Sequence, residues 1–145
     1  MSTAIHVLNG PNLNRLGRRE PAIYGTTTLA EIEALCRQEA GDSPLAFRQT
    51  NWEGQLIDWV HEAIDAAGAL VINPAGLSFT SVSLLDALKM FPGPLIELHI
   101  SNVHRREPLY HHSYVSTVAT AVIAGLGAEG YPVAVRAAKR LLAAG

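Results

Sequence analysis

Glu97 and His99 stand two residues apart in the segment Glu97–Tyr114, which holds four of the six histidines. Side chains two apart on a strand point to the same face, so the carboxylate can hold the imidazole in one tautomer as an acid or base. The alternative is a buried histidine that a carboxylate merely satisfies. The other three histidines, which we expect to support the following loop or an interface, are His104, His111 and His112.

A second group lies in the segment Asn12–Gly25, where Tyr24 follows Arg15, Arg18 and Arg19. A free phenol has a pKa near 10, so a tyrosine base working near neutrality needs roughly 4 kcal/mol of phenolate stabilisation. Water screens the charge of an exposed arginine, but an arginine in contact with the phenolate under a closed segment could supply that stabilisation. So long a connection predicts a lid, and a solvated basic loop is the alternative.

Other kinds of chemistry have weaker support. The histidines lack HExxH-like spacing and have no cysteine near them, which argues against a metal site. Ser78 and Ser81 do not sit in a G-x-S-x-G motif, and the loop NGPNLN lacks a glycine-rich phosphate cradle. We therefore expect neither a metal nor a bound cofactor.

Short apolar runs alternate with longer amphipathic ones along the chain. The predicted strands are Ala4–Leu8, Leu45–Gln49, Ala69–Ile72, Leu95–Ile100 and Thr120–Ala124. The predicted helices are Leu29–Ala40, Glu53–Ala67, Ser81–Phe91 and Ala128–Ala143. Thr28 and Asn51 are the expected caps at the starts of the first two helices.

This alternation predicts an α/β protein, with residues 1–145 forming one domain. Five strands favour a flavodoxin-like three-layer sandwich whose five-stranded parallel sheet has the order 2-1-3-4-5. Ligands bind such sheets beyond the carboxyl ends of the strands. Asn9, Asn12, Asn73 and His99 follow or end three strands there, which favours a site at that rim.

Composition limits the function classes. The chain has 145 residues, 48% of them hydrophobic and 17% charged, with a net charge of −2, so it has no basic stripe for nucleic acid. Cys36 is the single cysteine, which fits a reducing compartment. The N-terminus does not resemble a signal peptide, and the most apolar run, Val115–Ala128, is too short for a membrane span. We expect a cytoplasmic protein with a small-molecule partner.

The stretch VLNGPNLNRLGRREPAIYG resembles the N-terminal signature of type II 3-dehydroquinate dehydratases. The likeness continues through QTNWEGQLIDWVHEA, VINPAGLSFTSVSLLDAL, PLIELHISNVHRREPLYHHSYVS and GLGAEGYPVAVRA, and so covers nearly the whole chain. It implies a hydro-lyase without metal or cofactor that converts 3-dehydroquinate into 3-dehydroshikimate by trans elimination through an enolate. It also implies a homododecamer, a tetramer of trimers.

The resemblance assigns roles residue by residue. It implies that Tyr24 takes the proton from C2 while Arg19 keeps it ionised, and that Asn12 holds a water at the enolate oxygen. It implies that His99, oriented by Glu97, protonates the departing hydroxyl. The residues implied in substrate binding are Asn73, the backbone amides of Ile100 and Ser101, Arg106 in the lid, and Asp86 from a neighbouring subunit.

Two positions depart from the family pattern. Phe79 stands where the family has histidine, and Tyr110 where it has arginine, both toward the far hydroxyls of the substrate. A site with apolar replacements discriminates a hydroxyl less well, and each lost partner costs about 1–3 kcal/mol. Three hypotheses follow: a divergent dehydroquinase of the shikimate pathway or quinate catabolism, a lyase for a related carboxylated β-hydroxyketone, or a carboxylate-binding module without turnover.

Overall fold

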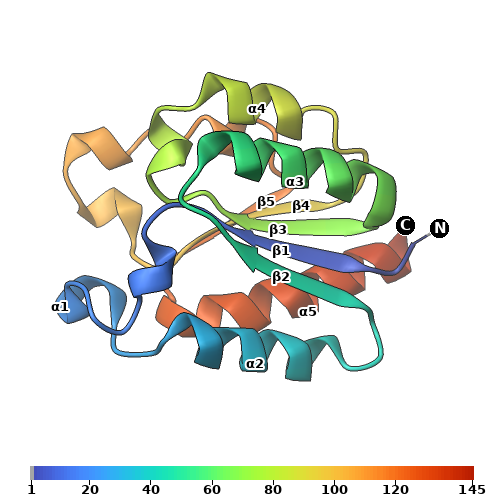
Figure 1. Cartoon of the computed structure of the whole chain (residues 1–145), viewed down its shortest axis with the longest axis horizontal. Coiled ribbons are helices and arrows are strands. Elements are labelled where there is room, and N and C mark those ends of the chain that lie inside the picture. Colours follow the sequence, from blue (N-terminus) through green and yellow to red (C-terminus); the bar gives the residue numbers. More distant parts are fainter. Residues whose placement is uncertain (1) are drawn as a thin grey trace.

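The computed structural model describes residues 2–145 and shows a five-stranded parallel sheet between two helical layers (Figure 1). The strand order is β2-β1-β3-β4-β5, as the sequence predicts. The strands are β1 Ile5–Asn9, β2 Leu45–Gln49, β3 Ala69–Asn73, β4 Leu95–His99 and β5 Ala121–Ala124. β1, β3 and β4 are buried along their whole length, since helices cover both faces of the sheet there.

Helices α2 and α5 pack together on one face of the sheet, and α3 and α4 on the other (Figure 1). The helices are α1 Pro21–Tyr24, α2 Leu29–Ala40, α3 Glu53–Ala66, α4 Val82–Leu88 and α5 Gly130–Ala144. The short α1 lies in the segment expected to be a loop, and Pro at its first position has the fixed φ that a helix start favours. None of the helices in residues 2–145 is long and apolar enough to cross a membrane.

The helix starts confirm one expected cap and correct another. Thr28 caps α2 in a capping box with Glu31. Asn51 does not cap α3, whose N-cap residue is Trp52, because the Asn51 Oδ1 atom accepts the backbone N–H of Asn12 at 2.9 Å. α4 is shorter than predicted and begins after Ser81, whose hydroxyl accepts the N–H of Leu84.

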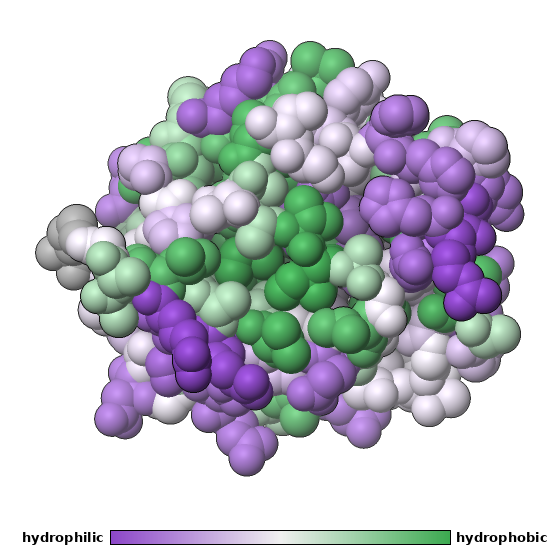
Figure 2. Space-filling model, turned by 180° about the vertical axis from the view of Figure 1, so that it is seen from behind, coloured by the Kyte–Doolittle hydropathy of each residue, from purple (hydrophilic) through white to green (hydrophobic). Residues whose placement is uncertain are grey.

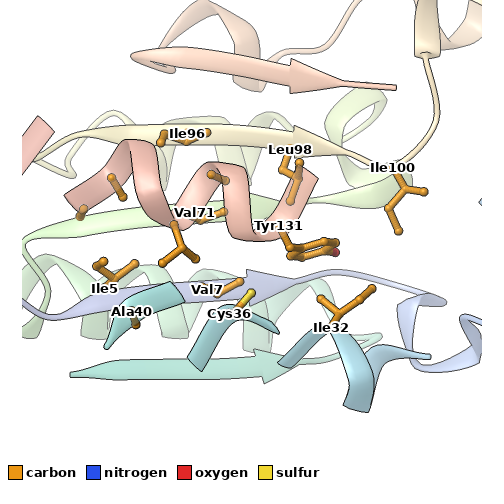
Figure 3. Packing of buried hydrophobic residues seen from close by; sticks show 14 of the residues in the cluster. Ile5, Val7, Ile32, Cys36, Ala40, Val71, Ile96, Leu98, Ile100 and Tyr131 are labelled. Atoms are coloured by element: carbon orange, nitrogen blue, oxygen red, sulfur yellow. The ribbon is translucent and has the colours of Figure 1, made fainter. Parts of the chain in front are cut away.

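Two hydrophobic clusters fill the space between the layers. Figure 3 shows the one under α2 and α5, where Tyr131 and Cys36 pack against Val7 and Leu98. Burial raises the pKa of the Cys36 thiol to about 12, so it stays protonated and behaves as a small apolar side chain. This cluster gives the central strands a fixed position.

β5 forms one edge of the sheet, and its residues Ala121 and Val122 are exposed. Figure 2 shows the face behind that of Figure 1, where hydrophobic side chains gather within a polar border. Natural proteins usually cover or blunt such an edge. This face is therefore a candidate for contact with another chain.

The ends of β1 and β3 approach each other closely. The N–H of Gly10 donates to the carbonyl oxygen of Asn73 at 2.9 Å, and a Cβ atom at Gly10 would lie 2.5 Å from the carbonyl oxygen of Pro74. Only glycine fits this approach. It brings Asn9 and Asn73, which are paired in register, to the same rim of the sheet.

Candidate active site

A pocket of about 160 Å³ lies beyond the carboxyl ends of β1, β3 and β4, where the sequence places a site. Every predicted site residue except Glu97 and Asp86 lines it. Those that do are Asn12, Arg19, Tyr24, Asn73, Phe79, His99, Ile100, Ser101, Arg106 and Tyr110. The structure thus brings together residues from four separate parts of the chain.

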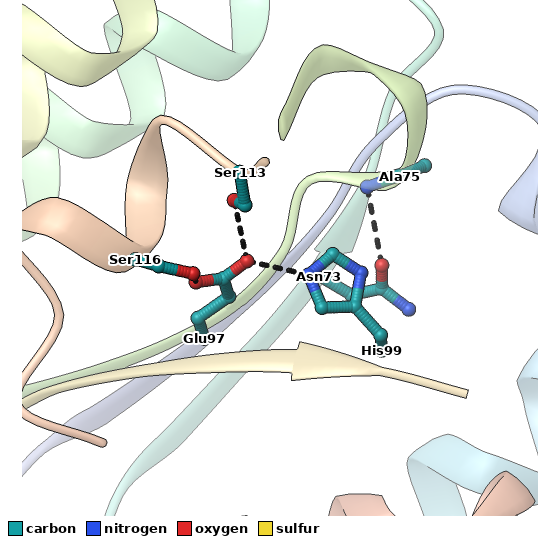
Figure 4. Close-up of polar contacts among 6 residues, drawn as sticks. All are labelled: Asn73, Ala75, Glu97, His99, Ser113 and Ser116. Carbon is teal, nitrogen blue, oxygen red and sulfur yellow. Dashed lines mark hydrogen bonds and ion pairs between the residues drawn. The ribbon is translucent and has the colours of Figure 1, made fainter. Parts of the chain in front are cut away.

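One part of the site is the acid half, which we define as Glu97, His99, Ser113 and Ser116; of these, His99 lines the pocket. Glu97 is fully buried on β4, and His99 two residues later is 5% exposed. The His99 Nε2 atom lies 2.5 Å from Glu97 Oε2 (Figure 4). Because an ionised carboxylate only accepts hydrogen bonds, Nε2 carries the proton in this pair.

Glu97 has two further donors that sequence reasoning missed. The Ser113 hydroxyl donates to Oε2 and the Ser116 hydroxyl to Oε1, each at 2.6 Å (Figure 4). Burial alone would raise the pKa of Glu97, but the hydrogen bonds from His99 and both serines outweigh burial and hold this pKa below its usual range. Glu97 is therefore an anion at neutral pH.

The other part of the site is the base half, which we define as Arg19, Tyr24 and Arg106, all of which line the pocket. The Tyr24 hydroxyl oxygen accepts hydrogen bonds from Arg19 Nη2 at 3.3 Å and from Arg106 Nη1 at 3.1 Å. Both guanidinium carbons also lie over the ring, at 4.3 Å and 5.6 Å from its centroid. Two cationic donors therefore converge on one phenol oxygen. The sequence predicted Arg19 in this role but not the contact of Arg106.

The segment that carries Tyr24 is anchored rather than free. Leu13 and Leu16 are buried in the cluster that also contains α2 and α5. Asn12 takes a left-handed conformation, with a φ of 73°, which asparagine tolerates better than most residues. These contacts hold the predicted lid against the rim and place Arg19 and Tyr24 in the pocket wall.

An amide network fixes the middle of the rim. Asn73 Nδ2 donates to the Tyr131 hydroxyl at 2.9 Å, and this hydroxyl donates to Asn9 Oδ1 at 2.7 Å. Asn73 Oδ1 accepts the backbone N–H of Ala75 (Figure 4). Burial raises the pKa of Tyr131, which keeps it a neutral donor. Asn9, expected at the rim, is fully buried and serves this network instead of lining the pocket.

The two positions that depart from the family pattern touch each other. The rings of Phe79 and Tyr110 meet edge to face with centroids 5.3 Å apart, and Phe79 stacks on His99 at 6.0 Å. The Arg106 guanidinium lies 4.0 Å from the centroid of Tyr110. These contacts connect the base half to the acid half across one wall of the pocket.

Two other predicted residues behave differently. Asp86 is exposed on α4, pairs with Lys89 at 3.6 Å and does not line the pocket of its own chain. A ring N–H of His111 donates to the carbonyl oxygen of Arg106 at 2.7 Å, so His111 braces the loop that holds Arg106. That contact confirms its expected structural role.

Residues 3–139 match the family described as Dehydroquinase class II. The chain belongs to the class II dehydroquinase family. It is 54% identical to a 3-dehydroquinate dehydratase of Cereibacter sphaeroides strain ATCC 17029 over 147 residues, all of both chains. It is 58% identical to 3-dehydroquinate dehydratase 2 of Agrobacterium fabrum, with 90% of each chain covered. The crystal structure of the type II dehydroquinase from Propionibacterium acnes superposes with a TM-score of 0.91 at 45% identity, covering 97% of this chain and 98% of that one.

The predicted family and the predicted fold are therefore both confirmed. The residues that sequence reasoning missed, Ser113, Ser116 and Tyr131, lie far along the chain from their partners. A weak signal existed for Tyr131, because a buried tyrosine hydroxyl needs a hydrogen-bond partner. The serines gave none, since nothing local indicates that they contact Glu97, which lies sixteen residues before Ser113 and nineteen before Ser116.

Proposed function

We propose that this class II dehydroquinase is a hydro-lyase that dehydrates 3-dehydroquinate to 3-dehydroshikimate. The observation that carries the proposal is the pairing, in one pocket, of Tyr24 held by two guanidinium groups with His99 held by a buried carboxylate. A base and an acid that line the same pocket suit the removal of a proton and a hydroxyl from neighbouring carbons.

In the first step, the Tyr24 phenolate takes the proton from C2, next to the ketone. The electron pair of the broken C–H bond moves into an enolate. Arg19 and Arg106, which contact the phenol oxygen, favour its ionised form before the transfer. Asn12 lines the pocket and would hold a water that donates to the enolate oxygen.

In the second step, the enolate returns its electron pair, the C1–O bond breaks, and His99, protonated on both ring nitrogens, gives its Nδ1 proton to the departing hydroxyl, which leaves as water. Glu97 supports this transfer because its anion holds Nε2 and stabilises positive charge on the ring. The proton gained by Tyr24 and the proton lost by His99 balance once both exchange with solvent.

The substrate carboxylate would lie at Asn73 and the backbone amides of Ile100 and Ser101, which line the pocket directly after His99. Asp86 does not line this pocket, so its expected role requires a neighbouring subunit. Both assignments remain predictions for a ligand-bound structure.

The two alternative functions are not favoured. Relatives that are 54% and 58% identical carry the name 3-dehydroquinate dehydratase. Arg106 lies against Tyr110 and keeps a cationic group close to the end of the pocket where Phe79 and Tyr110 replace polar residues. That cation supports a hydroxylated substrate over an apolar one.

The direct test adds 3-dehydroquinate to the purified protein and follows absorbance of the conjugated enone in the product. We expect a steady rise that Tyr24→Phe and His99→Ala each abolish nearly completely. No rise at about millimolar substrate, a typical upper range for KM, would contradict the proposed function. Carboxylate binding without turnover would point to a binding module.

We also propose a homododecamer, a tetramer of trimers, in the cytoplasm, acting in the shikimate pathway or in quinate catabolism. The exposed apolar edge at β5 and the outward position of Asp86 support an assembled form. The single buried Cys36 suits a reducing compartment. Light scattering on the eluting protein tests the assembly, and a monomer would contradict it.

A further inference from the structure

Glu97 receives one donor from its own strand β4, His99, and two from a segment beyond that strand, Ser113 and Ser116. Ser113 and His99 both donate to Oε2, and Ser116 donates to Oε1. In the part of the chain that the structure describes, the titratable side chain that contacts Glu97 is His99. Apart from His99, the side chains that hydrogen-bond to the Glu97 carboxylate are therefore those of Ser113 and Ser116.

The segment that carries the serines is fixed independently of Glu97. Val115, between them, is fully buried in the cluster with α3 and α4. The backbone N–H of Tyr114 donates to the carbonyl oxygen of Ser78 at 2.8 Å. Packing and a backbone bond thus hold the backbone that carries both serines beside Glu97, without help from the carboxylate.

The same segment reaches His99 from a second direction. Ser78, which accepts the bond from Tyr114, directly precedes Phe79, and the Phe79 ring stacks on His99 with centroids 6.0 Å apart. One end of the imidazole is held through Glu97 and its face through Phe79. Residues 113–116 support both contacts.

The serine hydroxyls matter to the chemistry because an ionised and a protonated carboxyl group accept different numbers of hydrogen bonds. An ionised carboxylate accepts from all three donors, whereas a protonated one must donate a proton and loses part of that set. The anion accepts a hydrogen bond from His99 Nε2–H and stabilises positive charge on the ring, so that Nδ1–H can donate to the departing hydroxyl. A second set of contacts that locks a catalytic group is what a preorganised site requires.

We propose that Ser113 and Ser116 are positioning residues for the dehydration, acting through Glu97 to hold His99 in the orientation and protonation state that the departing hydroxyl needs. This inference rests on the proposed function. Neither serine lines the pocket, so their effect falls on the chemical step rather than on substrate binding.

The test compares Ser113→Ala, Ser116→Ala and the double variant with Thr117→Ala. Thr117 is a matched control, because its hydroxyl belongs to the same segment but donates to the carbonyl oxygen of Tyr114. We expect each serine variant to lower kcat about 10-fold, with KM within about twofold, since one hydrogen bond to a charged group is lost. The acid limb of the kcat profile should move up by about one pH unit.

Ser113→Thr and Ser116→Thr keep the hydroxyl and should restore most of the rate and the position of the acid limb. If the alanine variants lose thermal stability but keep the kcat and pH profile of Thr117→Ala, the serines are only structural and the inference is wrong. If the double variant does not fold, the single variants decide by the same criteria.

A measurement without substrate separates this inference from the proposed function. Infrared difference spectra of the unligated protein report the protonated carboxylic acid of Glu97, assigned with Glu97→Gln. We expect its band to appear at higher pH in the alanine variants than in wild type. An unchanged band overturns the inference even if the enzyme is active, whereas absent turnover with a shifted band defeats only the proposed function.

Discussion

His99 is borne by a central strand of the sheet and is 5% exposed, and its partner Glu97 is fully buried. Tyr24, by contrast, is half-buried at the end of a one-turn helix in a long connection, and its arginine partners come from two surface segments. The acid half is thus part of the core, while the base half is assembled on top of it. The comparison teaches that one reaction can combine an acid built into the core with a base carried by a surface connection that is packed against that core.

This difference has a consequence for mutations. A change in the acid half should affect both catalysis and folding, because it disturbs buried polar groups. A change in the base half should affect catalysis with little effect on folding. Substitutions in each half test that separation.

Tyr24→Phe and His99→Ala should each lower kcat about 10³-fold, since each removes a group that transfers a proton. Their melting temperatures should differ. His99→Ala leaves buried Glu97 without one of its three side-chain partners, a loss of about 1–3 kcal/mol. Scanning calorimetry should show a fall of roughly 2–8 °C for His99→Ala and almost none for Tyr24→Phe. Equal destabilisation would break the comparison.

Arg19→Leu and Arg106→Leu should each lower kcat about 10-fold, because each removes one charged donor from the Tyr24 oxygen. Arg106→Leu should be the more damaging, since Arg106 also stacks on Tyr110. Arg18→Leu, an exposed arginine of the same segment that does not line the pocket, is the matched control. If Arg18→Leu lowers kcat as much as Arg19→Leu, the overall positive charge of the segment, and not direct contact with Tyr24, supports the base.

The sequence predicts the acid half better than the base half. Strand alternation alone places Glu97 beside His99, and their hydrogen bond confirms it. The parallel sheet and its order also follow from the alternating pattern. These features depend on local periodicity, which a single sequence carries.

What the sequence does not contain is contact between distant segments. Arg106 lies 82 residues from Tyr24, and Tyr131 lies 122 residues from Asn9, so no local pattern indicates either pair. Asn51 is a case where a local pattern gave a wrong prediction. Its residue type favours a helix cap, but its side chain instead accepts the backbone N–H of Asn12. Tertiary contacts overrode a local preference there.

A smaller effect is expected at the wall between the halves. Tyr110→Leu removes the ring that packs against Phe79 and Arg106, which should raise KM about 3- to 10-fold with a smaller change in kcat. Tyr110→Phe keeps both ring contacts and should stay within about twofold of wild type. Steady-state kinetics distinguishes the two variants. If phenylalanine is as damaging as leucine, the Tyr110 hydroxyl and not its ring is what the site uses.

The last prediction concerns stability at acid pH. The pKa of Glu97 is lowered in the folded state: burial opposes ionisation, and hydrogen bonds from His99, Ser113 and Ser116 outweigh it. The ionised carboxylate therefore stabilises the fold fully above the unfolded pKa of 4.5, and this contribution is lost as pH falls through the lower folded value. Urea unfolding between about pH 3 and 7 should show wild type losing stability more steeply below that pH than Glu97→Gln, which cannot ionise.

Glu107→Gln is the control for this measurement, because it removes an exposed carboxylate from a neighbouring segment and should leave the acid slope as in wild type. A shallower slope in Glu97→Gln alone would show that ionisation of the acid half is coupled to folding of the sheet that carries it. If wild type and Glu97→Gln lose stability in parallel, that coupling is absent. Ionisation of the acid half would then contribute no more to folding than the base half does. The charge of the carboxylate that the serine hydroxyls hold would matter only during turnover.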